Sequence, residues 1–317
     1  MRGARQKVKN KDCYYHCYSR IAGPKDLYLF TDVDKEKGMK IVVDLCKLYL
    51  IEPISMTWMD NHWHIIVFAP SKVPSIEEAA ERYNLYYKKK NKQVICPIDN
   101  PKRCKDIAER MIDISCFMQQ IHQKFTFHIN RTHNRRGTLW AERFKSTILQ
   151  KENALWNCVK YVELNPVRAG IIDDPMDYRF STWGNYNGIG KHLFGDNFSR
   201  HMRRCFGLKA ANWSDEDIFA KFRSQLARII ADESGALMNE IKEAGELARK
   251  KESIPIRFLR RTRHWTDGAI IGSKAFVQSV ACRFDDSKKV MKKQLSCGTD
   301  LSDNIIYCYK RLQRNLN

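Results

Sequence analysis

The sequence predicts an α+β fold, with a small central antiparallel sheet covered by helices and a mostly helical C-terminal domain. Strand-like and helical segments follow one another in the order β-α-β-β-α-α-β-α through the first part of the chain, a mixture typical of this class. Glycine gathers at 184–197 and marks a boundary, and beyond it no alternation of apolar and polar residues is convincing. We therefore predict domains at 1–187 and 198–317.

The first strands and the helix between them follow from local patterns. Residues 13–21 are rich in aromatic side chains, which favours a strand. Apolar residues recur at roughly helical spacing over 33–50, which predicts a helix. Two further strands are expected at 54–59 and 62–69, because the Asp-Asn pair between them tolerates the positive φ of a tight hairpin.

Helical patterns dominate the next stretch. Ser75, followed three residues later by Glu78, forms a capping box that starts a helix, and this helix should run to about residue 90. After a loop that contains two prolines, a second helix is expected from 102 to about 131.

The end of the first predicted domain contains one more strand and one more helix. The strand is expected at 143–150 and the helix at 152–164. Pro166 ends the helix, because the residue before a proline is pushed out of the α region.

The charge of the chain indicates an anionic partner. Its 56 lysines and arginines against 36 aspartates and glutamates give a net charge of +20. Nucleic acid is the usual partner for such an excess, and a basic protein with no such partner is the alternative. No membrane-spanning helix is expected, because the chain lacks an apolar run of 18 or more residues. A membrane surface is a less favoured partner, because the basic residues do not concentrate on one amphipathic helix. With no secretory pattern at the start, we expect a cytoplasmic protein with reduced thiols.

A His-x-His pattern is the sharpest local feature. Residues two apart on a strand point to the same face, so His62 and His64 should present two imidazoles side by side, with Trp63 on the other face. Such a pair is half of a metal site or a general acid-base pair. Because the pattern is common, two histidines that only form hydrogen bonds remain an alternative.

The helix around Tyr161 is the second feature. Tyr161 and Asn165 are four residues apart and therefore share a helix face. A phenol with a pKa near 10 is a poor nucleophile at neutral pH, and it attacks a phosphodiester only if another group, such as a metal ion, carries the developing charge. Taken alone, the helix is better explained by an ordinary amphipathic tyrosine that packs by its ring and keeps its hydroxyl in solvent.

Three segments together resemble the REP-associated tyrosine transposases, which are relatives of the single-strand insertion-sequence transposases of the HUH nuclease class. The segments are Met59-Asp60-Asn61-His62-Trp63-His64, the basic Gly137–Ser146, and Tyr161–Gly170. The resemblance covers about residues 1–187. It implies a ferredoxin- or RRM-like core that cuts and rejoins single-stranded, hairpin-forming DNA through a covalent 5′-phosphotyrosine. One departure is Asp60, where the family often has proline; we expect it to change the turn rather than to bind metal.

The resemblance also implies a role for individual residues. Tyr161 matches the nucleophile, and His62, His64 and Asn165 match the metal ligands. Two imidazoles and an amide oxygen suit Mg²⁺ or Mn²⁺. No nucleotide cofactor is expected, because the phosphotyrosine retains the bond energy. The basic residues expected to contact DNA phosphates are Arg20, Arg135, Arg136, Arg143, Lys145 and Arg168.

Other functions fit parts of the same pattern. A catalytically inactive hairpin-DNA binding protein or regulator would keep the charge without needing Tyr161. A hydrolase that uses metal-activated water would keep the histidines but leave the tyrosine structural. The expected partner in each case is palindromic or hairpin-forming single-stranded DNA, and a homodimer is possible. Residues 254–280 fit either a helix-turn-helix or a helical bundle with a basic face.

Overall fold

The computed structural model describes residues 7–8, 10–24, 27–88, 94–243, 264–299 and 305–310. The chain divides into two compact units. The first contains residues 1–54 and 58–145, and the second contains residues 55–57 and 146–317. Strands and helices occur in both units, which confirms the predicted α+β class.

The first unit contains the predicted histidine-bearing sheet. Its strands are β1 (Cys13–Arg20), β2 (Glu52–Trp58) and β3 (His62–Ala69), in the order β2-β3-β1. Residues 55–57, in the middle of β2, are grouped with the second unit. β1 and β3 are antiparallel, with Cys13 opposite Ala69 and Arg20 opposite His62. β3 is buried along its whole length after His62, as expected for a central strand with packing on both faces.

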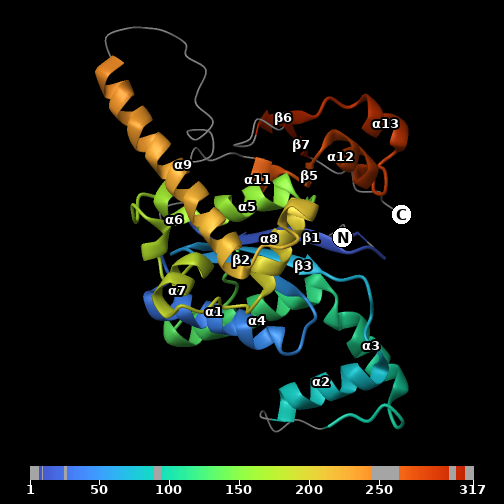
Figure 1. The fold of residues 1–317 in the computed structure, drawn as a ribbon. Coiled ribbons are helices and arrows are strands. Elements are labelled where there is room, and N and C mark those ends of the chain that lie inside the picture. Colours follow the sequence, from blue (N-terminus) through green and yellow to red (C-terminus); the bar gives the residue numbers. More distant parts are fainter. Residues whose placement is uncertain are drawn as a thin grey trace. The chain divides into compact units, whose positions relative to one another are not determined.

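Two helices cover one face of these strands: α1 (Asp32–Cys46) and α4 (Ile114–Thr132) lie side by side (Figure 1). Gly38 lets α1 approach the sheet closely, since a Cβ there would lie 2.7 Å from ring atoms of Trp58. Phe125 of α4 also packs against the Trp58 ring, with ring centroids 4.6 Å apart. Large aromatic side chains therefore form the core between helices and sheet.

A helical pair, α2 (Ile76–Lys88) and α3 (Pro101–Met111), completes the first unit. The Ser75 hydroxyl accepts a hydrogen bond from the backbone of Glu78 at 3.1 Å, so the cap lies where it was predicted. The prediction of a single helix from 102 to about 131 was wrong, because the segment forms two helices, α3 and α4. Asp113 interrupts it and caps α4, accepting from the backbone nitrogens of Ser115 and Cys116; apolar periodicity continues through the break and conceals it.

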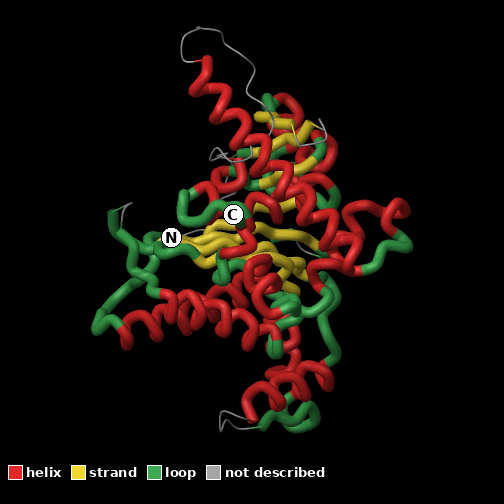
Figure 2. Tube along the Cα trace, turned by 60° about the vertical axis from the view of Figure 1, so that its left-hand side comes forward, coloured by secondary structure: helices red, strands yellow, loops and turns green. Residues whose placement is uncertain are grey.

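The second unit combines short strands with helices. β4 (Lys145–Leu149) pairs in parallel with β5 (Ile270–Gly272), and the first residue of β4 is grouped with the first unit. β5 pairs antiparallel with β7 (Ile305–Tyr309), and β7 pairs antiparallel with β6 (Ser296–Thr299). α9 (Asp215–Glu243) is a helix of 29 residues, and it runs without a break in Figures 1 and 2. The helices and 3-10 turns are α5 (Asn153–Glu163), α6 (Asn165–Arg168), η1 (Pro175–Asp177), α7 (Thr182–Ile189), α8 (Asn197–Phe206), η2 (Gly207–Ala210), α9 (Asp215–Glu243), α11 (His264–Asp267), α12 (Lys274–Ala281) and α13 (Ser287–Lys292).

The glycine-rich segment is partly helical. Gly184 lies inside α7, where a Cβ would come within 2.1 Å of the Tyr178 carbonyl oxygen. Gly190 ends α7 with a φ of 67°, a backbone conformation that glycine adopts without strain. Glycine therefore serves close packing as well as a turn here, and the domain boundary in this segment stays a prediction.

The C-terminal part is mostly helical, as expected, and also contributes the short strands β5, β6 and β7. The basic half of the possible helix-turn-helix, with Arg257, Arg260, Arg261 and Arg263, lies outside the described residues. In the ranges that the structure describes, no helix has the length and apolarity needed to cross a bilayer.

Candidate functional site

The two histidines share one face of β3. The ring centroids of His62 and His64 lie 5.2 Å apart, with the ring planes nearly perpendicular. Trp63 is fully buried on the other face, beside Trp58 and the α4 residue His122. His64 is buried and His62, at the start of the strand, is half-buried. The alternation expected of this strand is therefore confirmed.

The Nδ1 atom of each histidine ring lies within hydrogen-bond distance of a neighbouring side chain. His62 Nδ1 lies 2.7 Å from Asn61 Oδ1, so this nitrogen donates the hydrogen and the ring's lone pair is on Nε2. His64 Nδ1 lies 2.9 Å from His16 Nε2. Histidines that bind metals commonly have the other ring nitrogen hydrogen-bonded in this way, which fixes the tautomer and the ring orientation. Both rings are thus oriented through Nδ1.

β1 supports the histidine face. Tyr18 lies opposite His64 in the strand register, and the rings of Tyr18 and His16 stack on the His64 ring, with centroids 5.6 and 5.0 Å away. Arg20 lies opposite His62. The Lys145 ammonium is 5.9 Å from the centroid of the Tyr18 ring and forms an ion pair with Glu142 at 2.6 Å. Strand pairing thus brings Arg20 and Lys145 to the neighbourhood of the histidines.

Asp60 acts on the turn between β2 and β3. Its carboxylate accepts a hydrogen bond from Lys35 of α1 at 2.8 Å, and its carbonyl oxygen accepts from the backbone nitrogens of Leu29 and Phe30. These contacts tie the turn to α1 and to the segment before it. The expected effect of Asp60 on the turn agrees with this geometry.

The other predicted DNA contacts of the first unit lie between α4 and β4. Arg136 and Arg143 are exposed, and Arg135 is half-buried. Asn134 has a φ of 47°, which makes the tight turn that separates these residues from α4. Trp140 stacks on His122 with centroids 4.4 Å apart, so it packs in the core rather than standing free as a platform for bases.

In the second unit, Tyr161, Asn165 and Arg168 form one cluster at the end of α5. Asn165 Nδ2 donates to the Tyr161 carbonyl oxygen at 3.3 Å. Arg168 Nη2 donates to the same oxygen at 3.2 Å and to Asn165 Oδ1 at 2.5 Å. The guanidinium also lies 3.8 Å from the centroid of the Tyr161 ring. The break before Pro166, where α5 ends and α6 begins, folds Arg168 back onto the tyrosine.

This cluster is closely packed. Tyr161 is only 2 % exposed, and Trp265 of α11 packs against it with ring centroids 5.8 Å apart. Asn165 Oδ1 already accepts from Arg168, but a carbonyl oxygen has two acceptor positions and keeps the capacity for a second contact. For the phenol to meet a phosphodiester, part of its cover must open.

Glu163 is a buried carboxylate near Tyr161 that the sequence did not indicate. Its carboxylate accepts from the Ser55 hydroxyl at 2.6 Å and from the Trp183 backbone nitrogen at 3.1 Å. Burial raises the pKa of Glu163 to about 7. The side chain holds α5 to a segment of β2 and to the first turn of α7, which fixes the helix that carries Tyr161.

The predicted metal ligands are divided between the units: His62 and His64 belong to the first, and Asn165 belongs to the second. Within the described part of the chain, no group of three or more histidine, cysteine, aspartate or glutamate side chains could hold a metal ion. A metal bound by the histidine pair would therefore need oxygen donors of another kind, such as an amide, a phosphate or water. This donor chemistry is compatible with Mg²⁺ or Mn²⁺.

A comparison with solved structures finds a structure described as the REP-associated tyrosine transposase bound to a REP hairpin. The match has a TM-score of 0.39 and 15% sequence identity, and it covers 61% of this chain and 90% of that chain. No protein-family model matches this sequence. No curated protein matches it either.

Proposed function

We propose that this protein is a metal-dependent transposase that cuts and rejoins single-stranded, hairpin-forming DNA through a 5′-phosphotyrosine. The observation that carries the proposal is the histidine pair of β3, in which each Nδ1 is held by a neighbour. A pair that only filled a polar patch would not need both rings oriented through the same atom. The cytoplasm is the expected location, and the net charge of +20 suits a DNA partner.

His62, His64 and Asn165 would hold the metal, with the first two binding through Nε2. A bound Mg²⁺ or Mn²⁺ would polarise the scissile phosphate and offset the charge that develops there. The Asn61 and His16 contacts would hold the rings in place while the ion binds, as supporting residues commonly do at metal sites.

Tyr161 would be the nucleophile. Its oxygen forms a bond to phosphorus while the bond from phosphorus to the 3′ oxygen breaks, and the proton lost by the phenol is balanced by the proton gained at the 3′ oxygen. The products are a 5′-phosphotyrosine and a 3′-hydroxyl. A 3′-hydroxyl of another strand can reverse the step and rejoin the DNA, so no nucleotide cofactor is required.

Arg168 and the basic residues beside the histidines would bind the strand. Arg168 orients both Tyr161 and Asn165 through the contacts described above. Arg20 and Lys145 lie next to the histidine face and would contact phosphates, as would Arg135, Arg136 and Arg143. Such contacts supply affinity and register rather than base recognition.

Formation of a covalent adduct tests the proposal. The protein is incubated with hairpin-forming single-stranded DNA and Mn²⁺, and SDS-resistant complexes are separated on a denaturing gel. We expect an adduct that chelation of the metal prevents and that Tyr161→Phe abolishes. The matched control is Tyr186→Phe in α7, whose ring stacks on Phe219 and which should form the adduct normally.

Two outcomes would favour the alternatives. If DNA is cleaved without an adduct and Tyr161→Phe still cleaves, a hydrolase using metal-activated water is indicated. If the hairpin binds but remains intact with every divalent ion tried, the protein is a DNA-binding regulator. Binding that persists in Tyr161→Phe shows that loss of the adduct is not caused by misfolding.

A further inference from the structure

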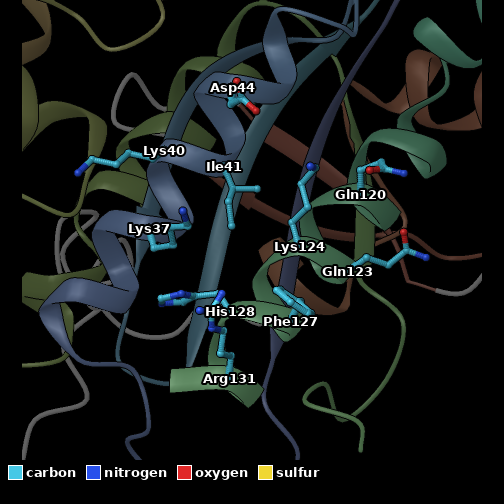
Figure 3. A pocket seen from close by; sticks show the side chains of 10 residues that line it. All are labelled: Lys37, Lys40, Ile41, Asp44, Gln120, Gln123, Lys124, Phe127, His128 and Arg131. Carbon is cyan, nitrogen blue, oxygen red and sulfur yellow. The ribbon is translucent and has the colours of Figure 1, made fainter. Parts of the chain in front are cut away.

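A basic groove lies between α1 and α4 in the first unit. It has a volume of about 650 Å³, and Figure 3 shows side chains of both helices around it. Lys37 and Lys40 come from α1, and Lys124 and Arg131 come from α4. The only carboxylate among its lining residues is that of Asp44, so positive charge predominates.

The acidic groups of α1 beside the groove do little to offset this charge. Asp44 accepts a hydrogen bond from Tyr86 at 3.0 Å and lies 3.5 Å from Lys47, so neighbours outside the groove already engage it. Lys40 lies 4.0 Å from Glu36, and both side chains are exposed. An exposed pair of this kind contributes little and is readily exchanged for another anion.

An aromatic ring stands among these cations. Phe127 is 70% exposed although it lines the groove. Lys124 precedes it by three residues and Arg131 follows it by four, so the three side chains share one helix face. Lys124 and Arg131 are about 10 Å apart along the helix axis, far enough to contact successive phosphates. Cations that follow a backbone, with an aromatic ring on which a base can stack, are typical of single-stranded nucleic acid sites.

The groove lies on the opposite side of the sheet from the histidines. Trp63 points toward α4, where it meets His122 with ring centroids 5.5 Å apart, whereas His62 and His64 point to the other face because side chains alternate along a strand. The outer surface of α1 and α4 is therefore separated from the histidine pair by the helices and the sheet. DNA bound there would be a different segment from the one held at the histidine pair.

We propose that this groove binds an unpaired DNA segment next to the hairpin and away from the scissile phosphate. Lysine and arginine side chains contact its phosphates, and a base stacks on Phe127. The choice of DNA as the ligand rests on the proposed function, whereas the preference for a phosphate-bearing single strand rests on the groove itself. The site would add affinity for hairpins that carry a single-stranded tail.

Equilibrium binding tests this proposal without requiring cleavage. Fluorescence anisotropy is measured with Tyr161→Phe protein and two labelled hairpins, one blunt and one with a single-stranded tail. In this background, the double variant Lys40→Ala and Lys124→Ala should bind the tailed hairpin roughly tenfold more weakly. Its salt slope should be lower by about 0.7 for each phosphate that the variant no longer neutralises. Phe127→Ala should weaken the same complex roughly fivefold or more. Neither variant should affect the blunt hairpin.

A matched control separates a defined site from general loss of charge. Lys102→Ala with Lys105→Ala removes the same charge from exposed positions of α3 and should leave the preference for the tail unchanged. The proposal is overturned if the control weakens binding equally, if the groove variants bind the tailed hairpin normally, or if polyglutamate displaces the tail as well as an oligonucleotide does. If the wild-type protein forms no adduct but the groove variants still lose tail binding, the proposed function fails and the groove assignment stands.

Discussion

His16 Nε2 lies 2.9 Å from His64 Nδ1, and this contact joins a fully buried residue of β1 to one of the two imidazoles of β3. We predict that His16→Ala raises the Mn²⁺ concentration needed for half-maximal adduct formation by roughly 10- to 100-fold, as loss of a supporting hydrogen bond does at other metal sites. His16→Gln, which keeps an acceptor at similar reach, should recover much of the loss.

A titration with Mn²⁺ at saturating DNA measures this effect, and DNA affinity serves as the check on folding. If His16→Ala binds DNA normally and needs no more Mn²⁺ than the wild type, His16 does not position a metal ligand. The contact with His64 would then contribute only to packing.

Arg168→Lys should slow adduct formation about tenfold or more. Arginine donates from one nitrogen to the Tyr161 carbonyl oxygen and to Asn165 Oδ1, and lysine cannot reproduce the planar guanidinium that also covers the ring. Single-turnover rates at saturating DNA measure the change. Arg179→Lys, at an exposed arginine that stacks on Phe180, is the matched control, and equal slowing in both variants would contradict a specific role for Arg168.

Asp34→Asn should lower the free energy of unfolding by about 2 kcal/mol. Asp34 is buried and accepts from His128 at 2.8 Å and His133 at 2.7 Å, and asparagine has one oxygen acceptor for these two donors. Burial alone would raise the pKa of Asp34, but hydrogen bonds from Thr31 and both histidines hold it below its ordinary value of 3.8. The wild type should therefore have a higher free energy of unfolding than Asp34→Asn above pH 3.8. This difference should disappear as the pH falls through the lower pKa that Asp34 has in the folded state.

Urea unfolding at several pH values measures the Asp34 effect. Asp32→Asn is the matched control, because Asp32 lies in the same helical turn with a side chain that is 61% exposed. A difference between wild type and Asp34→Asn that did not shrink in acid would show that the carboxylate charge is not responsible.

Glu163→Gln should remove a pH dependence of stability between pH 4.5 and 7. The folded state raises the pKa of Glu163 from 4.5 to about 7 through burial, so folding favours the protonated acid. The wild type should therefore lose stability relative to Glu163→Gln as the pH rises from 4.5 to about 7, by on the order of 3 kcal/mol. Paired unfolding curves across this range check the prediction, and parallel curves would refute it.

Sequence patterns predicted the parts of the fold that repeat regularly. The alternation around Trp63 placed His62 and His64 on one face, and the four-residue spacing placed Asn165 beside Tyr161. Both follow from local backbone geometry, which extends over only a few residues.

Features that depend on distant contacts could not be predicted in the same way. Glu163 became visible as a buried anchor only once Ser55, more than a hundred residues earlier, was seen to donate to it. β5 has three residues, too few for an alternating pattern. Gly184 was interpreted as part of a loop because glycine is common there. Its actual role is to let α7 pack against the Tyr178 carbonyl oxygen, a contact that the neighbouring sequence does not reveal.

Mass spectrometry of the DNA-linked protein tests the central claim most directly. Trypsin cuts after Lys160 and Arg168 and releases Tyr161–Arg168, a peptide with a single tyrosine. After nuclease digestion, we predict that this peptide carries a nucleotide joined through its 5′ phosphate to the tyrosine oxygen. Cleaved DNA accompanied by an unmodified Tyr161–Arg168 peptide, or by a nucleotide on another residue, would contradict the account.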